Sequence, residues 1–349
     1  MDRNPVILSP FELDIAAQPD ALREFARASP SPSAELAAIA RRDYDRIVFT
    51  GMGSSHFAAL PSWRQLVADG RSTWRVDTGQ LLDIPRLITE ATLLVITSQS
   101  GASGEIAALL SPAEGRQLSR PLAVVGITND PGSPLGRASD AVILLHSGPE
   151  ATVSTKSYLN SLAAHQQLLY ALIGTGTPDS PAGAAQVVSG LSPVSAAAGL
   201  ARVVTAASNP RVAFIGTRDH GATALYAGLI TKEAAKIAAE GFIGGQFRHG
   251  PLELAGPGLS AILFGAWADD TSGPVTGLAG DLVATGADVT LIGDLMLPGT
   301  RTIETPRGTT LAELAAGAVA AQHIAVQIAR ARGIEPGAFA YGQKVTTTL

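Results

Sequence analysis

Residues 47–56 read IVFTGMGSSH, an apolar run that ends in a turn rich in glycine and serine. Residues 93–103, LLVITSQSGAS, show the same pattern further along the chain. Strands buried on both faces of a parallel sheet are continuous apolar runs, and helices connect them. The two stretches therefore predict two parallel strands, each followed by a polar turn and a helix.

The alternation of apolar runs and helical patterns continues along the whole chain. Further strands are expected at 122–127, 141–145, 212–215, 260–264 and 289–292, and helices at 11–28, 34–41, 154–173, 222–239 and 311–331. Phe49 and Phe214 each precede a glycine turn, which indicates two copies of one unit. We predict an α/β fold with two doubly wound parallel-sheet domains in tandem.

The segment GTGTPDSPAG at residues 174–183 has the composition of a linker. It divides the chain into five predicted parts: an N-terminal helical segment at 1–34, a first domain at 35–173, a linker at 174–195, a second domain at 196–335 and a C-terminal tail at 336–349.

Composition narrows the class of protein. The 349 residues carry a formal net charge of −5, and no cluster of basic residues suggests a nucleic-acid partner. The most apolar helical stretch, 314–329, is interrupted by Gln322, His323 and Gln327, so no membrane span is expected. Cysteine is absent, which fits a reducing compartment. We expect a soluble cytoplasmic protein.

Hydroxyl-rich turns at the ends of predicted strands are the first candidate site. Ser54 and Ser55 follow one strand, and Ser98, Gln99, Ser100 and Ser103 follow the next. One such turn alone is typical of an ordinary helix cap. Two turns in one domain, with Ser154 at a third helix start, favour phosphate binding, because ligands of open α/β sheets bind at this edge.

Several other sites are disfavoured by their motifs. A dinucleotide fingerprint would need glycine at His56, and no GxxxxGK[ST] sequence occurs. Residues 101–105, GASGE, miss the GxSxG nucleophile elbow at the last position. The six histidines are dispersed, so we expect no metal site.

Glu233 and His249 are candidates for proton transfer. Glu233 lies in a predicted helix, and His249 follows in the segment GQFRHGP at 245–251. A carboxylate and an imidazole together can move protons near neutral pH. On these residues alone, the slightly better interpretation is a surface ion pair of Glu233 with Lys232 or Lys236, with His249 capping a turn.

Five motifs taken together resemble the sugar isomerase (SIS) family. They are GMGSS at 51–55, TSQSG at 97–101, VSTK at 153–156, KE at 232–233 with GGQFRHGP, and KVT at 344–346. The order is that of the isomerase half of glucosamine-6-phosphate synthase and of stand-alone phosphosugar isomerases and aminosugar-phosphate deaminases. The resemblance extends from about residue 11 to residue 349 and implies two SIS domains of flavodoxin-like type.

The resemblance also implies roles for individual residues. The phosphate of a sugar phosphate would be held by Ser98, Gln99, Ser100 and Ser103, with Ser54, Ser55 and Ser154 lining the sugar site. Glu233 would move a proton between C1 and C2, His249 from the partner subunit of a homodimer would assist ring opening, and Lys344 would lie by the carbonyl carbon. Such chemistry needs a base and an acid and no redox cofactor.

Two departures from the family leave the reaction open. Relatives that make glucosamine 6-phosphate carry a lysine where this chain has Ile230, and they read GELKHGP where it has GQFRHGP. No amidotransferase domain precedes residue 1 and no cysteine is present, so we expect no glutaminase activity. Deamination, aldose–ketose isomerisation and deglycation of a phosphorylated fructose–amino acid remain, beside a sugar-phosphate sensor without catalytic activity.

Overall fold

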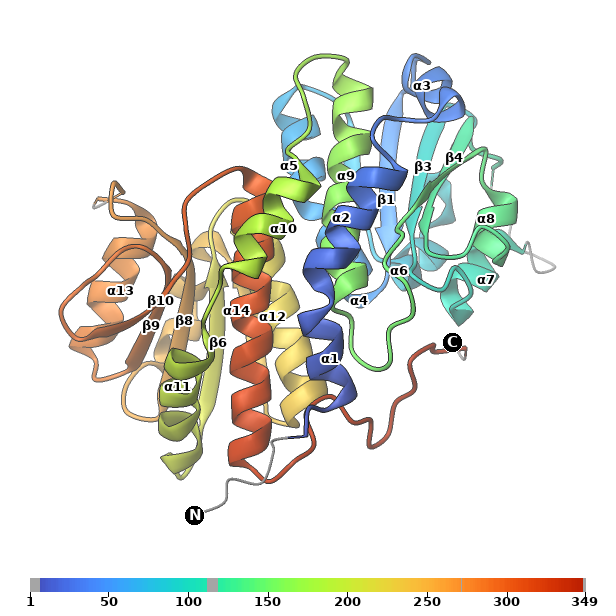
Figure 1. The fold of residues 1–349 in the computed structure, drawn as a ribbon. Coiled ribbons are helices and arrows are strands. Elements are labelled where there is room, and N and C mark those ends of the chain that lie inside the picture. Colours follow the sequence, from blue (N-terminus) through green and yellow to red (C-terminus); the bar gives the residue numbers. More distant parts are fainter. Residues whose placement is uncertain (1–6, 112–118, 271, 348–349) are drawn as a thin grey trace. The chain divides into compact units, whose positions relative to one another are not determined.

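The computed structural model describes residues 7–111, 119–270 and 272–347. The chain forms two compact units, each built around its own five-stranded parallel sheet (Figure 1). The first-sheet unit comprises Asp20–Gly148, Ser157–Gly183 and Val345–Leu349. The second-sheet unit comprises Met1–Pro19, Pro149–Lys156 and Ala184–Lys344. Both units thus draw on segments that are distant in the sequence.

The first sheet has the strand order β2-β1-β3-β4-β5, and every pair is parallel. Its strands are β1 (Arg46–Gly51), β2 (Thr73–Arg75), β3 (Thr92–Thr97), β4 (Ala123–Thr128) and β5 (Ala141–Leu144). Because β1 lies between β2 and β3, the chain leaves it first toward one edge and then toward the other. The reversal places a topological switch point at the carboxyl ends of β1 and β3.

Helices cover the first sheet and form its core. They are α2 (Gln18–Ala28), α3 (Ala34–Ala40), α4 (Gly53–Ala58), α5 (Leu60–Ala68), α6 (Thr78–Asp83), the 3₁₀ turn η1 (Pro85–Leu87), α7 (Gly104–Leu110), α8 (Pro134–Ala138) and α9 (Lys156–Ile173). Val48 and Ile96 of the sheet pack with Ile106 of α7 and Leu135 of α8 in one buried cluster. This cluster fixes α7 beside the end of β3.

The second sheet has the order β10-β9-β8-β6-β7, which repeats that of the first sheet. Its strands are β6 (Arg211–Gly216), β7 (Ala239–Ile243), β8 (Leu259–Ala266), β9 (Asp288–Gly293) and β10 (Thr300–Glu304). The first strand, β6, again lies between the second and the third. Phe49 and Phe214 occupy β1 and β6, so the predicted duplication of one α/β unit is confirmed.

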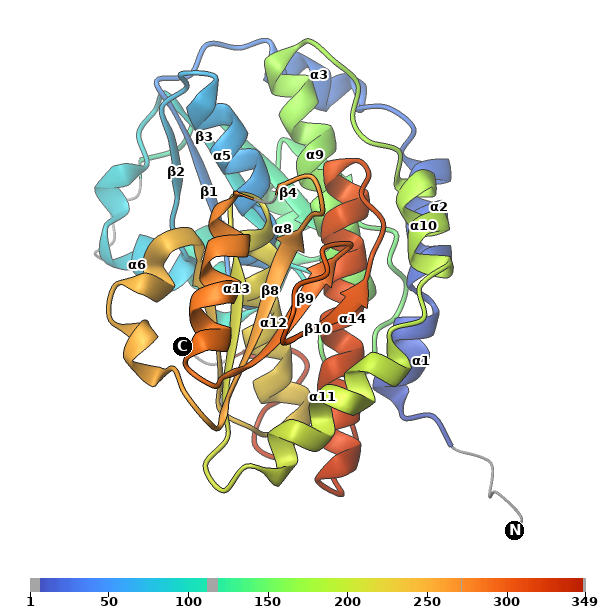
Figure 2. The same cartoon turned by 90° about the vertical axis from the view of Figure 1, so that its left-hand side faces the viewer.

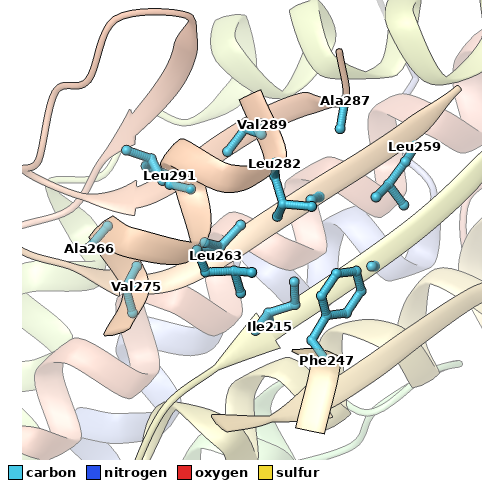
Figure 3. Close-up of a cluster of buried hydrophobic side chains, with 14 of the residues drawn as sticks. Ile215, Phe247, Leu259, Leu263, Ala266, Val275, Leu282, Ala287, Val289 and Leu291 are labelled. Carbon is cyan, nitrogen blue, oxygen red and sulfur yellow. The ribbon is translucent and has the colours of Figure 1, made fainter. Parts of the chain in front are cut away.

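The helices of the second-sheet unit lie on both faces of its sheet (Figures 1 and 2). They are α1 (Pro10–Ala16), α10 (Pro181–Ser189), α11 (Val194–Ala206), α12 (His220–Ala235), the 3₁₀ turns η2 (Gly244–Arg248) and η3 (Pro251–Leu254), α13 (Pro274–Ala284) and α14 (Thr310–Ala331). Helix α13 contacts β8 and β9, and α11 and α12 contact the sheet from the opposite face. Figure 3 shows Ile215, Leu263, Leu282 and Phe247 in the cluster on the α13 face.

Helix α14 is long and apolar enough to cross a membrane, contrary to the expectation from its three polar residues. Yet 83% of its most apolar window is buried in the fold, where it packs against α11 and α12. Helices α10 and α11 pass the same test only as one span, but they are bent by 69°. Burial inside the protein accounts for the apolar composition of α14.

The sequence misplaced the end of one helix. Helix α12 ends at Ala235 instead of continuing to 239, and Lys236 takes the left-handed conformation, with φ of 52°. The chain then enters β7. Gly228 of α12 faces Gly241 of β7, where an added Cβ would lie 2.7 Å from the Gly241 nitrogen. This close approach fixes the last turns of α12, which carry Glu233.

Candidate active site

The polar turns of the first-sheet unit lie at its topological switch point. Ser54 and Ser55 follow β1, and the segment 98–103 follows β3, the neighbouring strand. The side chains of Ser54, Ser55 and Gln99 make no hydrogen bond within the described part of the chain. Their polar groups are therefore not used by the fold and remain available to a ligand.

The turn after β3 keeps its hydroxyl protons free. Ser98 Oγ accepts a hydrogen bond from the Gly101 amide at 3.1 Å, and Ser100 Oγ accepts one from the Ala102 amide at 3.3 Å. Ser103 occupies the N-cap of α7 but makes no side-chain capping bond. If the turn served only to start a helix, Ser103 would cap it. In this turn the hydroxyl oxygens accept hydrogen bonds from backbone amides, and the O–H groups remain free to donate. Such a turn is suited to binding an anion.

Gly101 holds this turn in shape. Its φ is +63°, and an added Cβ would lie 2.1 Å from Ser133 Oγ. Both the conformation and the packing therefore require glycine. The C-terminal tail also reaches this turn, because the Gly104 amide donates to the Thr346 carbonyl at 3.0 Å.

His165 supports the end of β3 and was not predicted. It is fully buried on α9, and its Nε2 lies 2.9 Å from Thr97 Oγ1, one residue before Ser98. Burial lowers the pKa of His165 to about 3, so the ring is neutral at physiological pH. Only its isolated position on a helix marked it in the sequence.

Glu233 lies in the last turn of α12 in the second-sheet unit. Burial raises its pKa to about 7, while Lys344, Lys236 and Lys232 oppose the rise. The Glu233 carboxylate makes no hydrogen bond within the described residues; Lys236 Nζ bonds to the backbone carbonyl of Glu233 instead. A carboxylate of this kind can accept and return a proton near pH 7. Ile230 is fully buried one turn earlier, so no cation stands at that position.

Lys344 is held by Glu150, a residue that the sequence did not single out. The Glu150 side chain is completely buried, and its Oε2 lies 2.5 Å from Lys344 Nζ. Thr155 donates to Glu150 Oε1 through its amide at 2.7 Å and through its hydroxyl at 2.9 Å. Glu150 also acts on Glu233, whose pKa it helps to raise. Its only sequence signal is a carboxylate in the polar segment after a strand.

Ser154 belongs to the unit that carries Glu233 rather than to the unit of Ser54 and Ser55. Its carbonyl accepts a hydrogen bond from Tyr226 of α12 at 2.6 Å. Two residues later, Lys156 forms a buried ion pair with Asp14 at 2.8 Å. The VSTK motif is thus anchored at both ends to the second-sheet unit.

His249 is exposed and has no side-chain partner within the described residues. The residue two positions earlier, Phe247, is fully buried and packs edge-on against Phe242, with ring centroids 5.1 Å apart. Figure 3 shows Phe247 directed into the core. Because Phe247 is anchored in the core, His249 stays at the surface. Within the described part of the second-sheet unit, His249 makes no contact with Glu233.

The predicted residues therefore fall into two sets. The first-sheet unit holds Ser54, Ser55, Ser98, Gln99, Ser100 and Ser103. The second-sheet unit gathers Glu233, Lys344 and Glu150, with Ser154 in the same unit and His249 exposed. Among the described residues, no group of three or more histidine, aspartate or glutamate side chains is placed to hold a metal ion.

Comparison with known proteins supports the family resemblance that the motifs indicate. Residues 42–171 match the SIS domain family. A glutamine–fructose-6-phosphate aminotransferase (isomerizing) of Symbiobacterium thermophilum is 34% identical over 193 residues, which cover 52% of this chain and 31% of that protein. The chain therefore spans about a third of the length of this relative.

Solved structures share the fold of the chain. The C-terminal domain of glucosamine-fructose-6-phosphate aminotransferase from Francisella tularensis has a TM-score of 0.80 at 17% identity, covering 95% of this chain and 98% of that one. Glucosamine-6-phosphate deaminase from Thermotoga maritima has a TM-score of 0.75 at 20% identity, covering 97% and 100%. The resemblance predicted from five motifs is thus confirmed, and the chain carries a domain of the SIS family.

Proposed function

We propose that the protein is a phosphosugar isomerase or deaminase that acts on a 6-phosphorylated sugar, with an amino sugar such as glucosamine 6-phosphate converted to fructose 6-phosphate. The state of Glu233 carries this proposal. Its pKa of about 7, its carboxylate without a hydrogen bond and the cations around it are the properties of a base that moves a proton between C1 and C2.

The remaining groups fit the same reaction. In the open-chain sugar, Glu233 takes the proton from C2 and returns it to C1. Lys344, aligned by Glu150, supplies positive charge beside the carbonyl carbon, where a Schiff base is also feasible. In deamination, water then adds at C2 and ammonia leaves. The hydroxyls of Ser98, Ser100 and Ser103 would donate hydrogen bonds to the phosphate.

A panel of sugar phosphates tests the proposal. Glucosamine 6-phosphate, glucose 6-phosphate and a 6-phosphorylated fructose–amino acid are incubated with the protein, and ketose, ammonia and free amino acid are measured. We expect equal amounts of fructose 6-phosphate and ammonia from glucosamine 6-phosphate. Release of the amino acid would identify the deglycase instead. Tight binding of a sugar phosphate without any turnover would contradict the proposed catalytic activity and identify the protein as a sensor.

We also propose that His249 acts in the partner subunit of a homodimer, because it is exposed and contacts no other candidate within its own unit. Mixing two inactive variants of the protein tests this arrangement. Glu233→Gln and His249→Ala variants are each expected to be inactive as pure dimers. After random subunit exchange, half of the dimers are hybrids with one complete site, so about a quarter of the activity should return. No recovery would contradict a shared site.

A further inference from the structure

The second-sheet unit contains a cavity that none of the proposed catalytic residues lines. Its volume is about 400 Å³, within the range of small-molecule sites. It lies where Thr217–His220 follow β6 and Trp267–Asp270 follow β8, and the first turn of α14 completes the wall. Strands β6 and β8 are neighbours at the switch point of this sheet, the position that the serine turns occupy in the first.

The backbone is specialised around this cavity. Strand β8 contains a register shift between Phe264 and Ala266, at Gly265, whose φ is +72°. A Cβ at Gly265 would lie 2.5 Å from the His220 ring, so only glycine leaves room for the ring at this position. Arg218 also takes a left-handed conformation, with φ of +51°. Such bulges and strained residues are common beside binding sites.

One part of the cavity wall is fixed by pairing between its own side chains. His220 Nε2 lies 3.4 Å from Glu313, and the His220 ring packs against Trp267 with centroids 6.0 Å apart. Arg307 lies 5.6 Å above the Trp267 ring and forms an ion pair with Asp269. Arg307 and Asp269 therefore compensate each other's charge, and Glu313 is in contact with the His220 ring.

Two charged residues on the lining are left for a ligand. Arg218 and Asp270 are exposed, carry opposite charges and form no ion pair within the described residues. We propose that the cavity binds a small zwitterion, with an ammonium group at Asp270 and a phosphate or carboxylate at Arg218. Amino-sugar phosphates and free amino acids share this chemistry, and both fit the volume.

Trp267 provides a local signal for the test. It is the only tryptophan of the second-sheet unit, since Trp63 and Trp74 lie in the first. A full-length Trp63→Phe/Trp74→Phe variant is titrated with 2-aminoethyl phosphate, glucosamine 6-phosphate and alanine, and with inorganic phosphate and fructose 6-phosphate as ligands without an amine. We expect saturable fluorescence changes with the zwitterions, and the tightest of them identifies the source of the ligand.

Charge variants complete the experiment. Arg218→Gln and Asp270→Asn should each weaken zwitterion binding tenfold or more, because each removes a charged hydrogen-bond partner. Arg202→Gln, on the exposed face of α11, should change nothing. Glu233→Gln should keep this binding even though turnover is lost, which separates this site from the proposed reaction. No saturable signal, equal affinity for inorganic phosphate, or unchanged binding in both charge variants would overturn the proposal.

Discussion

The two sheets have the same strand order but different side chains at their switch points. In the first-sheet unit the turns after β1 and β3 carry serines and a glutamine without charge. In the second-sheet unit the turns after β6 and β8 carry an arginine at 218 and three aspartates at 219, 269 and 270. The strand order therefore determines where a ligand can bind, and the turn residues determine which ligand it is.

The candidate catalytic groups differ between the units as well. Those of the first-sheet unit follow the carboxyl ends of strands directly. Glu233 instead lies in the last turn of α12, and Lys344 and Glu150 come from loops anchored beside it. We infer that the first sheet supplies binding groups and the second unit supplies the proton-transfer groups. Four predictions test this division.

The largest effect is expected from Glu233→Gln. Loss of a general base should lower kcat by about 10²- to 10⁴-fold with little change in KM, because the serine turns still hold the phosphate. Steady-state kinetics with glucosamine 6-phosphate measures both constants. Glu240→Gln is the control, since Glu240 is an exposed carboxylate in the following strand. A large rise in KM with kcat intact would assign Glu233 to binding.

Gly101→Ala should destabilise the first-sheet unit by about 2–4 kcal/mol, since a left-handed alanine is strained and its Cβ overlaps Ser133. Gly148→Ala is a matched control, because Gly148 has φ of +65° but no atom within 4 Å of its Cβ. Its cost should be about 1–2 kcal/mol. Thermal melting compares the two variants, and equal losses would show that packing against Ser133 is unimportant.

Ser100→Ala should weaken binding of the sugar phosphate by roughly 10- to 150-fold, the value of one hydrogen bond to a charged partner. The melting temperature should barely change. Ser180→Ala removes a similar local bond, from the Gly183 amide, in an exposed turn and should leave binding intact. Isothermal titration distinguishes the variants. Normal binding by Ser100→Ala would make this turn a structural cap, like those of ordinary helices.

The last prediction concerns pH. The Glu233 carboxyl has a pKa near 4.5 when unfolded and about 7 when folded. Between these values the folded chain keeps a proton that the unfolded chain has lost, so stability falls as pH rises through this window. Glu233→Gln should therefore gain about 3 kcal/mol relative to wild type at pH 8 and nothing at pH 4. Melting at both pH values checks this, and a pH-independent difference would contradict it.

The central strands could be predicted because each is buried on both faces. Residues 47–49 and 93–96 are apolar without interruption, so the runs that form β1 and β3 were visible in the sequence. The edge strands β2 and β10 read TWR and TRTIE, and only one neighbour pairs with each. Their partly exposed residues carry no apolar run, so the sequence did not reveal them.

The sequence by itself determined the serine turns, because a turn and the strand before it are adjacent in the chain. It also marked Glu233, but it left open whether Glu233 was a base or a surface ion pair. Only the tertiary structure buries that carboxyl and raises its pKa. Glu150 was invisible for the same reason: its partner Lys344 lies 194 residues away, and folding alone brings the two charges together out of water. Local pattern specifies turns and strands, whereas electrostatic environment depends on contacts between distant segments.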